Sequence, residues 1–461
     1  MPGSRFPDRG TTCSICHRAL RRCFPLEVTQ LSTRFDPAEP QVPEPGPDAD
    51  ITRREALGGL AGTMGAVIAA TIPVASLAQA QTQVAASPSG TPARLTGAPT
   101  SALGTRSPFA SPGARSPTGL IAGSSFTPLQ NLSGTITPSD LHFERHHAGV
   151  PTIDPATHRL VIHGLVDRPL SLTVDEIRRF PQVTRVHFVE CSGNSRAAWV
   201  NPAPDMTPQR TDGMTSNSEW TGVPVATLFR EVGAQPAATW FLAEGADACL
   251  MTRSIPMEKA LDDALVVWAQ NGEPLRPEQG FPLRLLLPGW EGNANVKWLR
   301  RLELGTQPWM TRWETSKYTD PLKDGTARIF SFVMDAKSII TSPSVPSRLS
   351  GQGWRPVSGV AWSGRGRITR VEISADGGAT WHEAELQGQV LPKAHTRFSM
   401  MWNWTGEPAV LLSRATDESG YVQPTRKALL DARGAGTDYH NNAIRGWRVE
   451  PDGGIFFHWE T

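Results

Sequence analysis

Val186-His187-Phe188-Val189-Glu190-Cys191-Ser192-Gly193-Asn194-Ser195-Arg196 is the stretch of sequence around which the chain is organised. Its alternating apolar residues predict a strand that ends at Cys191, and Ser192-Gly193-Asn194 predicts a turn. A cation such as Arg196 beside a cysteine favours the thiolate, which is both the nucleophile and the metal-binding form. Most unpaired cysteines are instead small buried hydrophobes. This stretch alone leaves both interpretations of Cys191 open.

The length and charge of the chain limit the classes of protein to which it can belong. With 461 residues it exceeds one ordinary core, so we expect two folded domains. A net charge of +1 provides no basic field for nucleic acid. Fifteen Trp residues against three Tyr indicate large cores and interfaces without naming a function.

Residues 52–80 predict an export signal. Arg53 and Arg54 form a twin-arginine motif, an apolar stretch runs from Leu57 to Leu77, and Ala78-Gln79-Ala80 fits a cleavage site. A membrane anchor is the alternative, but the stretch is rich in Gly and Ala and only weakly hydrophobic. The twin-arginine route exports folded proteins that often hold a cofactor. We therefore expect a periplasmic protein with no membrane span after processing.

The segments on either side of this signal are not expected to fold. Residues 1–51 predict a leader that is removed, or a start site placed too early. They contain Cys13-Ser14-Ile15-Cys16-His17, which fits the motif for covalent haem c. Haem c is attached after export, so we expect no haem in the mature chain. Residues 81–125 are rich in Pro, Gly, Ser, Thr and Ala and predict a disordered linker.

Residues 126–320 show a mixed pattern of helices and strands, which predicts an α+β domain. Expected strands are His158–Gly164, Leu265–Ala269 and Leu283–Leu287, and expected helices follow Thr173, contain Leu228 and Phe229, and cover Ile255–Leu261. Thr173 with Glu176 three residues later predicts a capping box. The strict alternation of strand and helix found in a Rossmann sheet is absent from this pattern.

Residues 325–461 show an all-β pattern. The expected strands include Val357–Trp362, Ile368–Ser374, Thr396–Trp404, Val410–Ala415 and Trp447–Glu450, with a hairpin turn at Asp376-Gly377-Gly378. Short strands separated by turn signals predict an immunoglobulin-like sandwich. Such a module usually binds a partner or dimerises, and it rarely carries the chemistry.

Four polar clusters need a common explanation. They are Phe143-Glu144-Arg145-His146-His147, Glu244-Gly245-Ala246-Asp247, Gly280-Phe281-Pro282-Leu283-Arg284 and Asn293-Ala294-Asn295-Val296-Lys297-Trp298. Taken singly, each could be a solvated surface or a strand edge. Together with the Cys191 motif, in this order and spacing, they resemble the sulfite oxidase family of molybdenum enzymes. The resemblance runs from about Asp140 to the C-terminus, and Arg370–Trp381 is similar to the dimerisation domain of that family.

The resemblance implies a cofactor and a set of site residues. Cys191 would be the thiolate ligand of molybdenum, which one molybdopterin per chain would carry. The residues implied to bind the cofactor are Phe143, Glu144, Arg145, His146, His147, Cys191, Asp247, Gln279, Arg284, Asn295, Val296 and Lys297. The implied chemistry is oxygen-atom transfer. The implied catalytic residues are Cys191, Arg145, Arg196 and Tyr318. Arg145 and Arg196 would hold an anionic substrate, and Tyr318 matches the active-site tyrosine of the family.

Three departures from the family pattern predict a less cationic pocket. Ser195 stands at a position that is basic in animal sulfite oxidases, and Gln279 replaces a cofactor-binding histidine. A clear Asn-Leu-Arg-Gly motif is absent near the C-terminus, where His440 lies near the corresponding place. These features resemble the sulfane dehydrogenase branch of the family. Its substrate is a persulfide on a sulfur-carrier protein, its electron acceptor is a c-type cytochrome subunit, and a homodimer or heterotetramer is implied.

Three alternatives remain open at this point. A sulfite dehydrogenase that uses cytochrome c would have the same fold. A methionine-sulfoxide reductase of the same superfamily is disfavoured because such reductases lack the C-terminal β domain. A non-catalytic secreted binding protein would hold no molybdenum. Outside the motifs, Cys249 is expected to be a core thiol in a strand, and His187 is expected to be packed.

Overall fold

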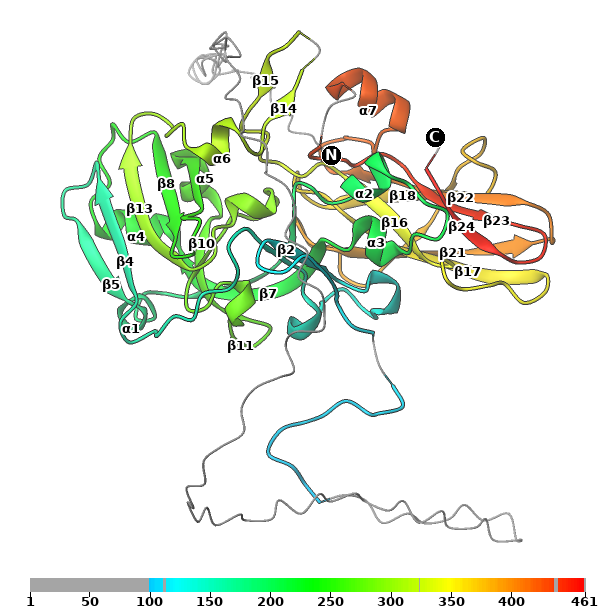
Figure 1. Ribbon diagram of the computed structural model, residues 1–461, viewed down its shortest axis with the longest axis horizontal. Helices are drawn as coiled ribbons and strands as arrows, with labels where there is room; N and C mark the ends of the chain where they lie inside the picture. The colour runs from blue at the N-terminus through cyan, green and yellow to red at the C-terminus, as the bar shows by residue number, and fades with distance from the viewer. Residues whose placement is uncertain (1–98, 111–112, 323, 435–437, 460–461) are drawn as a thin grey trace, which may run out of the picture. The chain divides into compact units, whose positions relative to one another are not determined.

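The structure is a computed structural model that describes residues 99–110, 113–322, 324–434 and 438–459 (Figure 1). The predicted leader (1–51), the predicted twin-arginine signal (52–80) and residues 81–98 of the predicted linker lie outside the described residues. The chain divides into the units Met1–Gly104 and Thr105–Thr461, and the described helices and strands lie in the second unit. None of the described helices has the length and apolar character that a membrane span requires.

The last part of the predicted linker is folded, which corrects that prediction. Strands β1 (Ser116–Thr118) and β2 (Gly123–Phe126) form a hairpin, and β2 pairs with β3 (Glu144–His146). Backbone hydrogen bonds hold this sheet, and Arg115 adds an ion pair with Glu144. The expectation was wrong because it relied on the lack of large apolar residues, which strand pairing does not require.

The predicted α+β domain contains two five-stranded sheets. One has the order β11-β10-β7-β6, with β12 also paired to β10, and the other has the order β5-β4-β13-β8-β9. Their strands are β4 (Arg159–Gly164), β5 (Leu170–Thr173), β6 (Val183–Glu190), β7 (Thr215–Pro224), β8 (Trp240–Gly245), β9 (Thr252–Pro256), β10 (Leu265–Gln270), β11 (Glu273–Pro274), β12 (Arg284–Leu286) and β13 (Leu299–Gly305). Only β4 and β13 pair in parallel among the described strands of these two sheets, as expected for an α+β rather than a Rossmann arrangement.

Short helices and 3₁₀ turns connect the strands of this part of the chain. They are α1 (Val174–Ile177), α2 (Arg196–Val200), α3 (Pro208–Asp212), α4 (Val225–Glu231), α5 (Met257–Asp262) and α6 (Arg312–Thr315), with 3₁₀ turns η1 (Leu129–Asn131), η2 (Ser139–Leu141), η3 (Pro277–Gln279) and η4 (Gly292–Ala294). The predicted capping box is confirmed, because Thr173 accepts from the Glu176 backbone and Glu176 accepts from the Thr173 backbone. The two sheets, α4 and α5 share a buried core that includes Ile162, Phe229 and Leu285.

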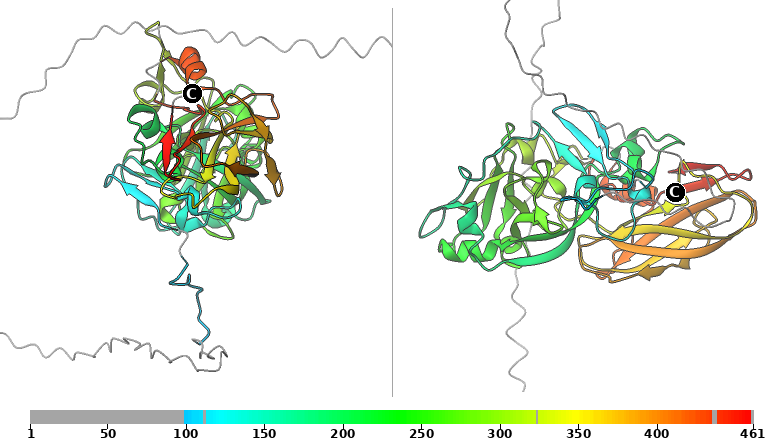
Figure 2. Two further views of the ribbon diagram at one scale, coloured as in Figure 1. Left: turned by 90° about the vertical axis from the view of Figure 1, so that its right-hand side faces the viewer. Right: turned by 90° about the horizontal axis from the view of Figure 1, so that it is seen from below.

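The C-terminal part is a sandwich of two sheets, as predicted (Figures 1 and 2). The sheet orders are β16-β17-β21-β20 and β19-β18-β22-β23-β24. The bounds are β16 (Lys337–Ser342), β17 (Gly353–Trp362), β18 (Ile368–Ser374), β19 (His382–Glu383), β20 (Glu385–Gln387), β21 (Thr396–Trp404), β22 (Ala409–Asp417), β23 (Gly446–Val449) and β24 (Ile455–His458), preceded by the hairpin β14 (Asp320–Pro321) and β15 (Ala327–Arg328). Trp362, Phe398 and Trp447 are fully buried in its core.

Two features of the sandwich were not predicted. Helix α7 (Arg426–Arg433) interrupts the expected all-β pattern, and Thr425 caps it by accepting from the Ala428 backbone. The sandwich core also continues into the first domain through Phe188 of β6 and Ala198 of α2. The stretch around Cys191 therefore packs against both parts of the molecule.

Buried neutral histidines at this boundary make stability depend on pH. The pKa of His395 is lowered to about 3, because the ring is buried and lies near Arg397. Only the unfolded chain takes up this proton between pH 6.5 and about 3, so the free energy of unfolding falls as the pH drops through this range. His187 is also buried, as expected, and burial lowers its pKa to about 4.

We expect the His395→Gln variant to lose part of this pH dependence, because glutamine does not titrate. Its free energy of unfolding should fall less steeply with acidification, by roughly 1.4 kcal/mol per pH unit. Urea unfolding of both proteins at several values between pH 6.5 and 4.5 measures the difference. Parallel curves for the two proteins would show that His395 does not carry the effect.

Candidate active site

Cys191 follows β6 directly and lies on the wall of a cavity. Its backbone N–H donates to the Met214 carbonyl at 3.0 Å, and the turn closes where the Asn194 N–H donates to the Cys191 carbonyl at 2.9 Å. The residue is 8% exposed. Burial raises the pKa of the thiol, although the Gly193 backbone and Arg145 oppose this effect. The unliganded thiol is therefore protonated, and it loses its proton when it binds a metal.

Arg196 does not supply the cation that the sequence predicted beside Cys191. It begins α2 with a side chain that is 53% exposed, and its Nε lies 2.9 Å from Asp438 Oδ1. The residues that line the cavity do not include Arg196. Arg145 is the cation whose charge acts on the Cys191 thiol instead. The Arg196 side chain does not lie beside Cys191 as predicted, because it forms an ion pair with Asp438, which is distant in the sequence.

Most of the other predicted site residues converge on this cavity from distant parts of the chain. The predicted residues that line it are Phe143, Arg145, His146, His147, Cys191, Asp247, Gln279, Arg284, Asn295, Val296, Lys297 and Tyr318. Met251, Gly292, Asn293 and Trp298 line it as well. Glu144 does not; it pairs with Arg115 and accepts from His146 Nε2 at 2.8 Å. Glu144 therefore does not reach the cavity as predicted, and it instead holds the His146 ring in place.

A polar chain connects Arg145, His147 and Tyr318. Arg145 Nη2 lies 3.4 Å from His147 Nδ1, and His147 Nε2 lies 2.6 Å from the Tyr318 hydroxyl. Burial and the charge of Arg145 lower the pKa of His147 to about 4, so its ring is neutral near pH 7. Burial raises the pKa of Tyr318, which keeps its hydroxyl protonated. Within the described residues Arg145 has no carboxylate partner, so its charge is available to an anion.

A second group of cations lies around Lys297. Its Nζ donates to the carbonyls of Glu278 at 3.0 Å and Arg145 at 3.2 Å, and it lies 2.8 Å from His146 Nδ1. Burial and the nearby Arg284 lower the pKa of Lys297 to about 7. A bound anion would reverse this effect, because it stabilises the charged ammonium.

Arg284 is a buried guanidinium without a carboxylate partner in the part of the chain that the structure describes. The residue is 3% exposed, and burial lowers its pKa to about 9. Its Nη1 donates to the carbonyl oxygen and to Oε1 of Gln279 at 3.3 and 3.2 Å, whereas its Nε has no partner among the described residues. Gln279 is held in turn by donating to the Phe143 carbonyl at 2.9 Å. A buried charge with an unused donor fits an anionic ligand such as a phosphate.

The remaining predicted residues shape the cavity wall. The Asn295 side chain holds its own loop, because it accepts from the Leu287 N–H and donates to the Trp290 and Glu291 carbonyls. Asp247 accepts from the Met251 N–H at 3.1 Å and from Cys249 Sγ at 2.8 Å.

Cys249 is half-buried in the turn between β8 and β9, not in a core strand as expected. Burial and Asp247 raise its pKa to about 12, so the thiol stays protonated.

The sandwich contributes groups beside the cavity, and His440, which the sequence placed near this position, is one of them. The His440 N–H donates to the Ser192 carbonyl at 2.8 Å, and His440 Nε2 lies 3.3 Å from Glu291 Oε2. Glu291 also pairs with Arg253 at 3.1 Å. Burial opposes ionisation of Glu291, but Arg253 and His440 lower its pKa to about 2. The Tyr439 ring lies 5.4 Å from the Tyr318 ring. No local motif joins Tyr439 and His440 to Arg253 and Glu291, because the two pairs are far apart in the sequence.

Two family models match the chain. Residues 147–313 match the oxidoreductase molybdopterin binding domain, and residues 328–446 match the Mo-co oxidoreductase dimerisation domain. Among solved structures, the sulfane dehydrogenase SoxCD from Paracoccus pantotrophus is 45% identical, with a TM-score of 0.76. The match covers 79% of this chain and 95% of that chain.

Curated relatives include enzymes with different substrates. Mitochondrial sulfite oxidase from Drosophila melanogaster is 33% identical over 64% of this chain and 54% of its own length. NADH nitrate reductase from Ulva prolifera is 32% identical over 63% of this chain and 38% of its own length. The chain thus spans about half or less of these relatives, whose names do not determine its substrate. Two matched domains and the likeness to SoxCD show that the chain belongs to the sulfite oxidase family of molybdopterin-binding oxidoreductases.

Proposed function

We propose that the chain is the periplasmic molybdenum subunit of a sulfane dehydrogenase, similar to SoxC. It would oxidise a sulfane sulfur bound to a carrier protein and pass the electrons to a c-type cytochrome subunit similar to SoxD. The observation that carries this proposal is the 45% identity to SoxCD over 95% of that chain. We further propose a catalytic domain at 126–320 and a dimerisation domain at 325–461 that forms a homodimer or a heterotetramer. Export by the twin-arginine signal at 52–80 belongs to the same proposal.

The residues of the cavity fit molybdopterin. Cys191 would bind the metal through Sγ, and a soft thiolate suits molybdenum. Arg284 and Lys297 would hold the phosphate, because Arg284 is buried, Lys297 is partly buried, and neither has a carboxylate partner in the described residues. Asp247, Gln279 and the backbone around Asn295 would meet the pterin edge. When bound, the cofactor supplies oxygen-atom transfer and two-electron redox chemistry.

The other cavity residues would bind and orient the substrate. Arg145 would hold the anionic end of the substrate beside Cys191, because no described carboxylate neutralises its guanidinium. The neutral His147 ring fixes the Tyr318 hydroxyl at 2.6 Å, and that hydroxyl keeps its proton because burial raises its pKa. Tyr318 can therefore donate a hydrogen bond into the cavity toward an oxygen that becomes more negative during the reaction.

We expect the Tyr318→Phe variant to lower kcat by about 10–100-fold, because it removes this donor from the reacting centre. Its molybdenum content should stay close to that of the parent, since the proposed cofactor ligands are unchanged. Tyr421→Phe is the matched control, because Tyr421 lies in the sandwich and contacts Asn442 at 3.2 Å. Equal kcat values for the two variants would remove Tyr318 from the mechanism.

The charge around Cys191 favours a carrier-bound substrate over free sulfite. Ser195 does not line the cavity, since its hydroxyl donates to Asp212 at 2.6 Å, and Arg196 pairs with Asp438. Of the two arginines that the sequence predicted to hold the substrate, Arg145 is therefore the one that lines the cavity. A single guanidinium suits a tethered persulfide better than a free dianion, which needs more countercharge.

A direct comparison of substrates tests this proposal. The purified protein with cytochrome c as acceptor would receive either thiosulfate-loaded carrier or free sulfite at equal concentrations. The proposal predicts a higher kcat/KM for the loaded carrier. Turnover of sulfite alone would instead identify a sulfite dehydrogenase. A protein without molybdenum would be a secreted binding protein.

A further inference from the structure

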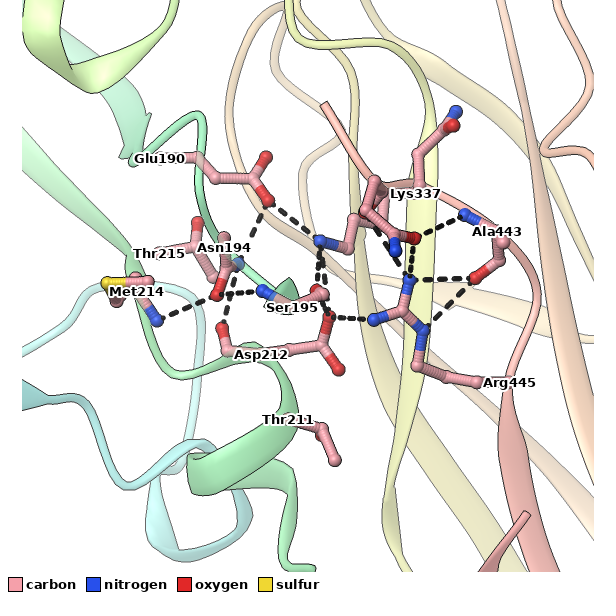
Figure 3. Close-up of polar contacts among 12 residues, drawn as sticks. Glu190, Asn194, Ser195, Thr211, Asp212, Met214, Thr215, Lys337, Ala443 and Arg445 are labelled. Atoms are coloured by element: carbon pink, nitrogen blue, oxygen red, sulfur yellow. Dashed lines mark hydrogen bonds and ion pairs between the residues drawn. The ribbon is translucent and has the colours of Figure 1, made fainter. Parts of the chain in front are cut away.

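A lysine of the sandwich contacts residues of the first domain at the boundary between the two parts (Figure 3). Lys337 is the first residue of β16 and is 2% exposed. Its Nζ lies 2.9 Å from Glu190 Oε1 and 3.2 Å from Asp212 Oδ1, and it donates to Ser195 Oγ at 2.7 Å. A buried ammonium persists only where such partners replace its hydration.

A second cation from the sandwich completes a buried charge quartet, which consists of Glu190, Asp212, Lys337 and Arg445. Arg445 Nη1 lies 3.2 Å from Asp212 Oδ1, and its other donors bind the Asn441 and Ala443 carbonyls. Two carboxylates from the first domain thus meet two cations from the sandwich. All four residues are buried. The quartet is balanced in charge, so removal of one cation leaves a buried negative charge uncompensated.

The quartet is bonded to both sides of Cys191. Glu190 directly precedes Cys191, and Asn194 Nδ2 donates to Glu190 Oε1 at 2.9 Å and to the Asp212 carbonyl at 3.0 Å. Asn194 Oδ1 accepts from the Met214 N–H at 3.1 Å, and the Met214 carbonyl accepts from the Cys191 N–H at 3.0 Å. A displacement of the Glu190 carboxylate would therefore shift the backbone on which the thiol is carried.

We propose that Lys337 is a positioning residue, which fixes the Cys191 turn through Glu190, Ser195 and Asp212. The sandwich would then help to form the active site in addition to any role in dimerisation. This inference rests on the proposed role of Cys191 as the metal ligand, but not on the identity of the substrate. Sequence reasoning missed it because Ser195 looked like the loss of a basic residue, whereas the structure places the Lys337 ammonium against its hydroxyl.

The Lys337→Met variant of the full holoenzyme tests the inference. Methionine retains most of the buried stem but not the charge. We expect kcat to fall at least about tenfold and KM to stay within about twofold, because the thiol moves while Arg145 stays in place. At equal molybdenum content, the electron paramagnetic resonance spectrum of the half-reduced enzyme should also shift, since it reports the ligand geometry.

Lys393→Met is the matched control. Lys393 is another sandwich lysine, and its Nζ lies 2.6 Å from Asp263 of the first domain, without contact to the Cys191 turn. The Lys393→Met variant should lower the melting temperature without changing the electron paramagnetic resonance spectrum. The Glu190→Gln/Lys337→Met double variant restores the charge balance, and it should recover kcat and much of the parent spectrum.

The outcomes separate the inference from the proposed function. A Lys337→Met enzyme with the parent spectrum and a kcat within about twofold would overturn the inference while the proposed function stands. If Lys337→Met does not fold, Ser195→Ala decides the matter, because it removes the hydroxyl to which Lys337 donates. This variant should shift the spectrum, and a parent spectrum in it would equally overturn the inference. A parent protein without molybdenum would overturn both.

Discussion

Replacement of Cys191 by serine is expected to lower kcat by at least about 10³-fold. A serine hydroxyl remains protonated near pH 7 and presents a hard oxygen, whereas the proposed metal site requires a soft thiolate. The fold should survive, because serine is similar in size and the backbone bond from residue 191 to the Met214 carbonyl is unchanged. Steady-state turnover with cytochrome c, normalised to molybdenum per chain, measures the loss.

Cys249→Ser is the control for this variant, because it makes the same chemical change in the turn after β8. A serine there can still donate to Asp247, as the thiol does at 2.8 Å. We expect its turnover to stay within about threefold of the parent. A Cys191→Ser enzyme that keeps more than a tenth of the parent turnover would show that the thiolate is not required.

Replacement of Arg284 by methionine is expected to reduce the fraction of chains that hold molybdenum at least about tenfold. The variant removes charge-assisted hydrogen bonds to the proposed phosphate, each worth about 1.5–3 kcal/mol. The same change should raise the melting temperature of the cofactor-free protein. The reason is that Arg284 is a buried charge without a countercharge, which destabilises the fold. The same burial lowers the pKa of Arg284 to about 9.

Arg253→Met is the matched control, because we expect it to change the melting temperature of the cofactor-free protein in the opposite direction. Arg253 is equally buried, but it pairs with Glu291 at 3.1 Å and Glu314 at 3.2 Å. Its removal leaves the buried Glu314 without a cationic partner among the described residues and Glu291 with His440 alone, so it should lower the melting temperature of the cofactor-free protein. If Arg284→Met destabilised the cofactor-free protein as Arg253→Met does, Arg284 would be a structural residue and not an anion site. Metal analysis and thermal melts of the two variants decide this.

Local sequence was sufficient to predict the strand before Cys191, the capping box at Thr173 and the sandwich strands, because each depends on near neighbours. The ordered motifs also predicted most of the cavity wall, including Arg284 and Lys297. Family membership explains this success, since the fold brings the same motifs together.

Where the sequence predicted a side chain's position wrongly, a partner distant in the sequence or in a neighbouring loop sets that position. Asp438 draws Arg196 out of the site, Arg115 holds Glu144 away from it, and Asp247 fixes Cys249 in a turn. The buried charge quartet joins residues 190, 212, 337 and 445, and no periodicity or spacing rule connects them. Such contacts are set by how the two domains pack, which a single sequence does not display.

X-ray absorption at the molybdenum edge reports how many sulfur atoms bind the metal. We propose that Cys191 binds molybdenum in the cavity that Arg145, Arg284 and Tyr318 line. We expect the parent protein to contain molybdenum with one more sulfur neighbour than the Cys191→Ser variant. An equal number of sulfur neighbours in the two proteins, or a parent protein without molybdenum, would contradict it.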